Sequence, residues 1–246
     1  MEALRALFMT MRPRQWTKNL LFVFPAIIFD GDLFEINALV RVVISFILLC
    51  LVSGTVYIIN DLVDIESDRQ HPRKKNRPLP SGKLPIRLAQ TAAVAIPVFA
   101  IGIALPLEWR LALVLSTYLV LQLMYSFWLK HVVIIDVMVI TAGFVLRVIA
   151  GVVVIQVNEF SPWLYICTGL LALFLAISKR RQELILLGDN AINVRRIYQE
   201  YNLPLLDEML RIATISTLIT YIVYTIETNA PLLANTNLAL LTVPFV

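Results

Sequence analysis

Residues 38–68 read ALVRVVISFILLCLVSGTVYIINDLVDIESD, an apolar run long enough to span a bilayer that ends in a cluster of acids. In a helix that turns by roughly 100° per residue, four polar side chains of this stretch fall within about 100° of arc: Asn60, Asp61, Asp64 and Asp68. Mg²⁺ prefers one or two carboxylates together with the oxygens of a substrate phosphate. The pattern therefore favours a magnesium site at the mouth of a membrane helix over the alternative, a solvated helix end.

The composition is that of a membrane protein. Of the 246 residues, 59% are hydrophobic and only 15% are charged, and the mean hydropathy is +0.79. These values exclude a soluble domain, and recurring runs of about 20 apolar residues predict an all-α, polytopic membrane helical bundle. We expect spans at residues 16–29, 38–59, 86–105, 111–127, 132–156, 162–178 and 208–226, and a last one from about residue 234.

The chain stops inside that last apolar run. We therefore expect the last helix to be truncated and a C-terminal part to be missing. Linkers and internal repeats are not evident, so the sequence predicts one membrane-embedded domain over residues 1–246.

The distribution of charge predicts the orientation. Lys and Arg gather in the N-terminal segment and in two long loops, residues 60–85 and 179–204, whereas the opposite side is mainly acidic. The positive-inside rule then places the N-terminus and both loops in the cytoplasm. The pI of about 9.2 reflects this topology, and no nucleic-acid-binding motif is present, so we expect no nucleic-acid partner.

Several Lys and Arg residues near the acids could neutralise the part of the substrate's phosphate charge that a bound metal ion does not. In the first long loop they are Arg69, Lys75 and Arg77, for which binding of anionic lipid headgroups is the alternative. Arg14 and Lys18, beside Arg12, suggest a second anion site at the membrane surface, where a plain interfacial anchor is the alternative.

Further candidates lie toward the C-terminus. Arg147 falls deep inside the run 132–156, and because a lone Arg there costs at least about 2.5 kcal/mol, we expect it to face a cavity or an anion. Tyr125 and Lys130 approach the cytoplasmic surface, where a belt aromatic and a snorkelling lysine are the alternative. Lys179 and Arg180 begin the second long loop and are candidates for phosphate contacts.

In this order the motifs resemble the UbiA prenyltransferase superfamily, whose first Asp-rich motif is similar to Asn60, Asp64 and Asp68. Within it, the chain is most similar to the decaprenyl-phosphate phosphoribosyltransferase branch. The shared stretches are RPRQWTKN (12–19), YIINDLVDIESDRQHPRKKNRP (57–78), YSFWLKH (125–131), GFVLRVIAG (143–151) and KRRQEL (179–184). The last departs from the superfamily, which has a second Asp-rich motif there. The resemblance implies nine helices around a cavity open to the cytoplasm, about eight of them visible here.

The resemblance further implies a Mg²⁺-dependent transfer of 5-phosphoribose from phosphoribosyl pyrophosphate to a polyprenyl, decaprenyl-like phosphate in the inner (plasma) membrane, with release of pyrophosphate. Asp61, Asp64 and Asp68 would be the catalytic metal ligands. Substrate-binding candidates are Arg14, Lys18, Asn60, Arg69, Lys75, Arg77, Tyr125, Lys130, Arg147, Lys179 and Arg180. The alternatives are prenyl transfer from a polyprenyl diphosphate to an aromatic or other acceptor, and a non-catalytic transporter. The sequence leaves open whether the chain forms a homo-oligomer.

Overall fold

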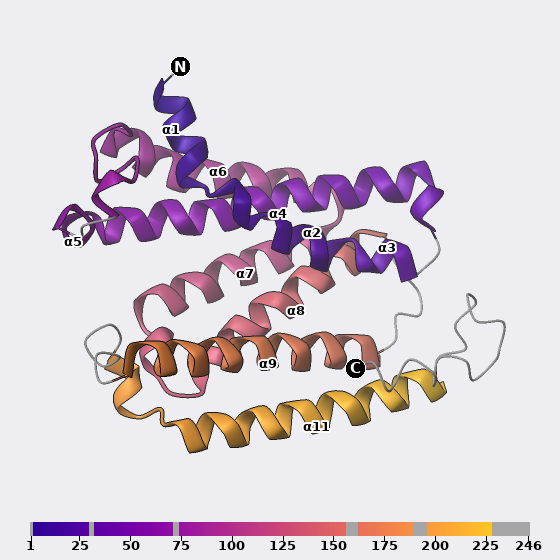
Figure 1. The fold of residues 1–246 in the computed structure, drawn as a ribbon. Coiled ribbons are helices and arrows are strands. Elements are labelled where there is room, and N and C mark those ends of the chain that lie inside the picture. Colours follow the sequence, from indigo (N-terminus) through magenta and orange to yellow (C-terminus); the bar gives the residue numbers. More distant parts are fainter. Residues whose placement is uncertain (1, 30–31, 71–73, 156–161, 189–195, 228–246) are drawn as a thin grey trace. The chain divides into compact units, whose positions relative to one another are not determined.

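The computed structural model describes residues 2–29, 32–70, 74–155, 162–188 and 196–227, and every regular element within them is a helix (Figure 1). The α-helices are α1 (Glu2–Thr10), α2 (Thr17–Val23), α3 (Pro25–Phe29), α4 (Ile36–Val63), α5 (Ile65–Gln70), α6 (Ile86–Leu107), α7 (Trp109–Phe127), α8 (Ile135–Ile155), α9 (Pro162–Leu187) and α11 (Leu203–Glu227). Short 3₁₀ helices lie at Pro13–Gln15, Asp32–Phe34, Lys74–Asn76, Leu129–His131 and Arg196–Gln199.

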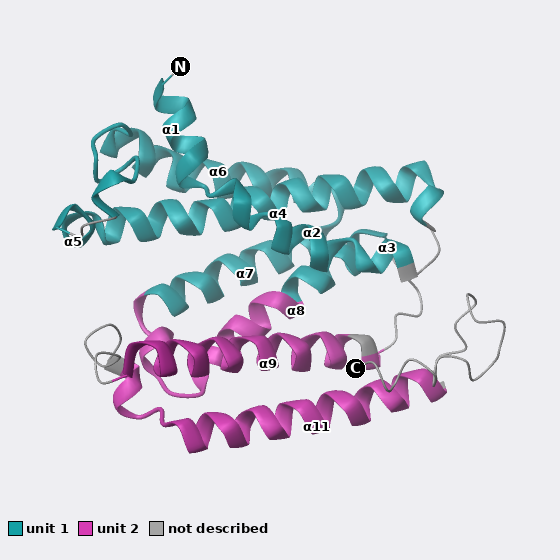
Figure 2. Ribbon diagram, viewed as in Figure 1, with its two compact units in different colours: residues 1–126, 146–157 teal, residues 127–145, 158–246 magenta. Residues whose placement is uncertain are grey.

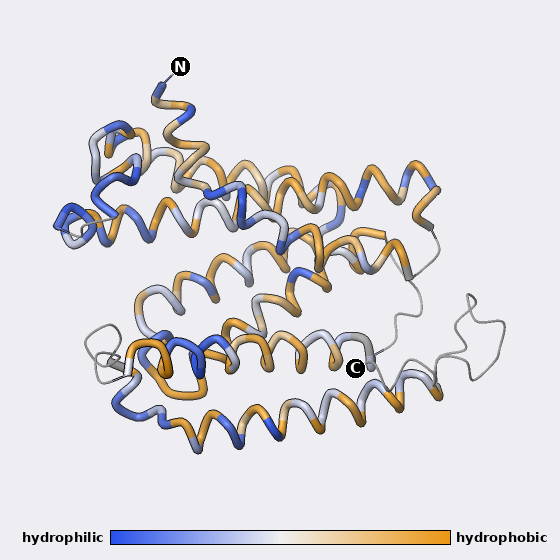
Figure 3. The backbone as a smooth tube through the Cα atoms, viewed as in Figure 1, coloured by the Kyte–Doolittle hydropathy of each residue, from blue (hydrophilic) through white to orange (hydrophobic). Residues whose placement is uncertain are grey.

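Five of these helices are long and apolar enough to cross a membrane: α4, α6, α7, α8 and α11. At 1.5 Å per residue the 28 residues of α4 extend about 42 Å, more than the roughly 30 Å of a hydrocarbon core. The chain is therefore an integral membrane protein, as its composition predicts. Figure 3 shows the apolar length of α4 giving way to hydrophilic residues at its α5 end.

The described chain divides into two compact units, residues 1–126 with 146–157 and residues 127–145 with 158–246 (Figure 2). In the first unit, α4 packs against α6 and α2, and its core includes Val23, Leu49 and Leu115. One contact is very close, because a Cβ added at Gly151 would lie 2.1 Å from the carbonyl oxygen of Val23. A residue without a side chain is thus needed at this position of α8.

In the second unit, α9 and α11 pack along each other. Val137, Ile177 and Leu206 are fully buried in its core, so the first half of α8 also contributes. Two tyrosines from the segment before α11, Tyr198 and Tyr201, join this core with their rings and keep their hydroxyls for polar partners.

The predicted spans agree with the helices to within about five residues except in two places. The expected span 16–29 is two helices, because Pro25 begins α3 and has no N–H to continue α2. The predicted span 162–178 is too short, since α9 continues to Leu187 and carries Lys179 and Arg180 on its last turns. The second long loop therefore begins later than expected, and the span predicted from residue 234 lies outside the described residues.

Candidate functional site

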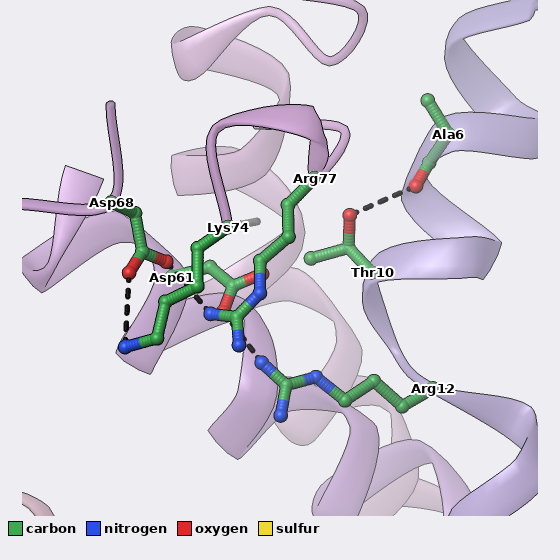
Figure 4. A network of polar contacts seen from close by, with 7 residues as sticks. All are labelled: Ala6, Thr10, Arg12, Asp61, Asp68, Lys74 and Arg77. Carbon is green, nitrogen blue, oxygen red and sulfur yellow. Dashed lines mark hydrogen bonds and ion pairs between the residues drawn. The ribbon is translucent and has the colours of Figure 1, made fainter. Parts of the chain in front are cut away.

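Two acids near the junction of α4 and α5 are held by cations from two segments of the first unit, the turn at Arg12 and the loop that carries Lys74 and Arg77 (Figure 4). Arg77 bridges two acids with one nitrogen, since its Nη1 donates to Asp61 Oδ1 at 3.2 Å and to Asp68 Oδ2 at 2.7 Å. Arg12 Nη2 donates to Asp61 Oδ1 at 2.8 Å, and Lys74 Nζ lies 3.3 Å from Asp68 Oδ1. We call these five residues the carboxylate cluster. Two carboxylates and three cations give it a formal charge of +1.

Asp64 does not join this cluster, although the helical spacing places it between the two acids. The chain turns at Asp64, which caps α4 with φ −90° and ψ 8° before α5 begins. Backbone hydrogen bonds continue through the turn, from Asp64 N to Asn60 O and from Asp68 N to Asp64 O. The result is that Asp61 and Asp68 are buried while Asp64 is exposed, so the predicted common face is only partly formed.

Arg12 reaches the cluster from an unusual backbone conformation. Its φ of 54° and ψ of 64° are left-handed, which costs a non-glycine residue about 1–2 kcal/mol. The side chain lies over the ring of Tyr57, with Cζ 4.6 Å from the ring centroid, while it donates to Asp61. Such strain is commonly kept where a residue serves a site.

The carboxylate cluster fits a divalent cation in the chemistry of its donors. Asp68 is fully buried, and its Oδ1 has no hydrogen-bond partner because the nearby Lys74 ammonium makes an ion pair without hydrogen-bond geometry. One positive centre, Arg77 Nη1, already lies between both carboxylates. Among the described residues no three acidic, His or Cys side chains converge on one point, so substrate and water oxygens would complete the shell, as Mg²⁺ commonly requires.

The loop cations divide differently from the sequence prediction. Arg69 pairs with the exposed Glu66 at 2.8 Å instead of the buried acids, and Lys75 is exposed. The cation that reaches Asp68 is Lys74, one residue earlier, which sequence analysis missed because a run of two lysines does not show which one turns inward. Of the three predicted loop cations, Arg77 is the one for which the described residues show a contact with Asp61 and Asp68.

The N-terminal candidates and Asn60 also belong to the first unit. Arg14 and Lys18 are exposed, and Asn60 is half-buried one residue before Asp61. Arg12, named only as their neighbour in the sequence, contacts the buried Asp61. The left-handed turn at Arg12 brings it there, and no sequence pattern signals that turn.

Arg147 lies in a polar network within the membrane part of the first unit. Its Nε donates to Asn19 Oδ1 at 2.8 Å and its Nη2 to Tyr118 Oη at 2.8 Å. Asn19 is buried, and its amide nitrogen also donates to Cys50 Sγ and Ser53 Oγ. The network joins α2, α4, α7 and α8, and it provides the polar surroundings that a membrane-embedded Arg requires.

Arg180 lies in a different network, in the second unit. Its Nε donates to Asp136 Oδ2 at 2.8 Å, and its Nη1 donates to Glu183 at 3.1 Å. Tyr201 donates to the other oxygen of Asp136 at 2.6 Å, and Tyr198 donates to Glu183. Burial and the Asp136 carboxylate raise the pKa of Tyr201 above its ordinary value, so this hydroxyl stays protonated. Asp136 and Arg180 are both buried, so this cation is structurally engaged.

The remaining candidates have more open surroundings. In the second unit, Lys179 is exposed beside the buried Arg180, and Lys130 is half-buried. Tyr125, in the first unit, is half-buried near the end of α7. Arg181, which sequence analysis did not select, pairs with Asp207 of α11.

Comparison with known proteins gives several matches of similar kind. Decaprenyl-phosphate phosphoribosyltransferase of Corynebacterium glutamicum is 34% identical over 78% of this chain and 58% of the relative. The protein of the same name from Mycobacterium tuberculosis is 35% identical over 77% of this chain and 64% of the relative. The chain thus spans about three fifths of the length of these relatives.

Solved structures and a family profile agree with the fold. A UbiA homologue from Archaeoglobus fulgidus, solved with DMAPP and Mg²⁺, superposes with a TM-score of 0.74 at 18% identity and covers 100% of this chain and 84% of that one. A digeranylgeranylglyceryl phosphate synthase structure gives 0.70 at 22% identity, covering 92% and 78%. The UbiA prenyltransferase family profile matches residues 20–246. The chain therefore belongs to the UbiA prenyltransferase family.

Proposed function

We propose that the protein is a Mg²⁺-dependent phosphoribosyltransferase that moves 5-phosphoribose from phosphoribosyl pyrophosphate to a polyprenyl, decaprenyl-like phosphate and releases pyrophosphate. The names of the curated relatives support this activity. The observation that carries it in this chain is the excess of cations over acids. The carboxylate cluster holds three cations on two carboxylates, and on α9 the exposed Lys179 adds a further cation.

This balance suits a donor and an acceptor that together bring many phosphate charges. Phosphoribosyl pyrophosphate carries a diphosphate and a 5-phosphate, and the acceptor adds a monophosphate. Cations that pair with phosphate oxygens make charge-assisted hydrogen bonds about twice as strong as neutral ones. A prenyl diphosphate donor with a neutral acceptor would bring fewer phosphate charges for these cations to bind.

In the proposed site, Asp61 and Asp68 would hold Mg²⁺, with the exposed Asp64 beside them and Asn60 in support. Bound Mg²⁺ would act as a Lewis acid that neutralises charge on the leaving diphosphate. Arg12, Lys74 and Arg77 would turn from the carboxylates to the diphosphate oxygens, because these anions offer the stronger charge. The chain's own cations therefore stabilise the departing group throughout the reaction.

The acceptor needs little activation. A lipid phosphate oxygen is already anionic at neutral pH, so a general base is not required, in keeping with only two His in the sequence. The C1–O bond to the diphosphate breaks as a bond from the lipid phosphate oxygen to C1 forms. Attack opposite the leaving group inverts C1, and positioning supplies much of the rate. Arg14, Lys18, Arg147, Lys179 and Arg180 are the further cations proposed to bind or orient phosphate groups; Arg69, Lys75, Tyr125 and Lys130 remain proposed at the edge of the site.

We place this chemistry on the cytoplasmic side of the inner membrane. The support is the excess of Lys and Arg at the ends of the helices that carry the acids. A water-soluble donor such as phosphoribosyl pyrophosphate would also reach the site from the cytoplasm.

The test uses purified protein in detergent with Mg²⁺, polyprenyl monophosphate and phosphoribosyl pyrophosphate labelled in the ribose. We expect label to enter the organic phase in proportion to pyrophosphate released, and EDTA to abolish both. Consumption of a prenyl diphosphate with an aromatic acceptor, without labelling of polyprenyl phosphate, would overturn the proposal in favour of prenyl transfer. Uptake of lipid phosphate into vesicles without pyrophosphate release would instead indicate a transporter.

A further inference from the structure

A groove of about 600 Å³ lies within the second unit, between the last turns of α9 and the first turns of α11. The residues around it, which we call the α9–α11 groove, are Leu175, Ser178, Lys179, Arg181, Gln182, Asp207 and Leu210. Arg180, the buried cation of the same turn, is not among them. The lining of the groove therefore does not include the Asp136–Arg180 network.

The lining of the groove is amphipathic along the axis of α9. Leu175 is 51% exposed, and Lys179 and Gln182 follow it at one and two turns along the helix. Leu210 adds a second apolar side chain from α11. An apolar end toward the hydrocarbon and a cationic end toward the cytoplasm together match a phosphate carried on a hydrocarbon chain.

The charge of the groove is set by three side chains. Lys179 and Arg181 contribute two positive charges, and Asp207 offsets one of them through its ion pair with Arg181. The side chain of Arg181 is 40% exposed and that of Asp207 is 45% exposed, so this ion pair contributes little to stability. A phosphate monoester, with up to two negative charges, can replace the carboxylate on Arg181 and engage Lys179 as well.

We propose that the α9–α11 groove binds the phosphate monoester of the polyprenyl acceptor lipid, an inference that rests on the phosphoribosyl transfer proposed above. Lys179 and Arg181 hold the phosphate, Ser178 and Gln182 donate to it, and Leu175 and Leu210 contact the first isoprene units. Asp207 holds Arg181 in place while the groove is empty and competes with the lipid for it.

Ribose 5-phosphate presents the same monoester chemistry on a wholly polar body, so the two sources need separate arms in the experiment. The probe is farnesyl phosphate, a short polyprenyl monophosphate, titrated into the protein in nanodiscs and followed by calorimetry. Ribose 5-phosphate and farnesol are titrated in parallel. We expect farnesyl phosphate to bind at least about tenfold more tightly than either, because ribose 5-phosphate lacks the hydrocarbon chain and farnesol lacks the phosphate.

The variants separate a lipid-phosphate role from a structural one. We expect Lys179→Gln and Arg181→Gln each to weaken farnesyl phosphate binding by about tenfold, as loss of one charge-assisted hydrogen bond implies. Arg181→Lys should restore part of the loss. Asp207→Asn should have the opposite effect and tighten binding several-fold, whereas a merely structural Asp207–Arg181 pair would give weaker binding or none.

Arg211→Gln is the matched control, because Arg211 also lies on α11 and pairs with an exposed acid, Glu208. Equal binding by wild type, Lys179→Gln and Arg181→Gln would overturn the groove assignment, and so would tighter binding of ribose 5-phosphate than of farnesyl phosphate. If phosphoribosyl transfer proceeds while the variants bind normally, the groove inference alone fails. If farnesyl phosphate binds as expected and no transfer occurs with any donor, the proposed function alone fails.

Discussion

Asp68 is the residue on which the carboxylate cluster depends most directly. Its side chain is fully buried, and Arg77 and Lys74 form ion pairs with it that offset the cost of burying a charged group. The same oxygens are the ones that a divalent cation would use. A substitution of Asp68 by a residue of the same shape thus tests the contribution of its charge to the site.

Asp68→Asn keeps the shape and removes the charge. We expect this variant to lose Mg²⁺-dependent transfer by about a hundredfold or more, because a metal ligand is lost. The measurement is labelled-ribose transfer, accompanied by size-exclusion chromatography to show that the protein is intact. Glu66→Gln, which changes an exposed acid two residues away, should keep near wild-type transfer. An active Asp68→Asn variant would contradict the metal assignment.

Arg77 competes with the metal for the same two carboxylates. In Arg77→Gln we expect Mn²⁺ alone to bind about fivefold more tightly, since one repelling cation is gone. With pyrophosphate present the order should reverse, because Arg77 then contributes a phosphate contact. Free Mn²⁺ measured by electron paramagnetic resonance reports both quantities without turnover.

The control for this comparison is Arg87→Gln, which removes an exposed cation from the first turn of α6. This variant should bind Mn²⁺ as tightly as the wild type does, both with and without pyrophosphate. An Arg77→Gln protein that binds Mn²⁺ as the wild type does, with and without pyrophosphate, would show that Arg77 neither competes with the metal nor contacts the diphosphate.

At the scale of helices, the close approach of α8 to the chain at Val23 makes a sharp prediction. Gly151→Ala places a Cβ against a backbone carbonyl, which cannot move aside like a side chain, so we expect a loss of about 1–3 kcal/mol in the free energy of unfolding. Gly102→Ala in α6 meets nothing within 4 Å and should stabilise the helix by about 0.5–1 kcal/mol. Thermal unfolding in detergent compares the two, and equal melting temperatures would contradict the tight contact.

The buried pair between α8 and α9 makes a second prediction at this scale. Arg180→Met leaves Asp136 buried without its cation, which we expect to cost about 3–5 kcal/mol, whereas the double variant with Asp136→Leu should recover much of that loss. Arg211→Gln removes an exposed pair and should cost less than about 1 kcal/mol. Chemical denaturation of the wild type, Arg180→Met, the double variant and Arg211→Gln gives the free energy of unfolding of each for comparison. A double variant as unstable as the single one would show that the ion pair is not the source of the effect.

The sequence predicted the elements of this fold better than the contacts between them. Apolar runs determine where a chain crosses a bilayer, so the long helices α4, α6, α7 and α8 lie within a few residues of their predicted positions. Helix ends were less predictable, because Lys179–Arg181 continue α9 where their charge suggested a loop.

Within the site, the spacing of the acids correctly brought Asp61 and Asp68 together. It also included Asp64, because a regular helix was assumed where the chain turns. The partners of the cations depend on two features that no local pattern encodes, the left-handed turn at Arg12 and the folding of the loop that selects Lys74 over Lys75. The ion pair of Arg180 could not be predicted locally, because its partner, Asp136, lies 44 residues earlier in the sequence.

At the scale of the whole molecule, the orientation in the membrane is open to direct measurement. The two ends of α6 should face opposite sides, with Ser81 in the cytoplasm and Arg110 outside. A membrane-impermeant maleimide should label Arg110→Cys in intact cells and Ser81→Cys only after permeabilisation. The wild-type protein, with Cys50 buried and Cys167 half-buried, gives the background. The reverse pattern would place the proposed site outside the cell.

The Asp136–Arg180 pair also bears on how the protein is made. The ribosome delivers Asp136 well before Arg180, and until both have emerged each helix carries a charge that the bilayer disfavours. The two charges neutralise each other only when α8 and α9 lie together. We therefore expect the translocon to release these helices into the lipid as one hairpin, with α8 retained near the water-filled exit until its partner arrives.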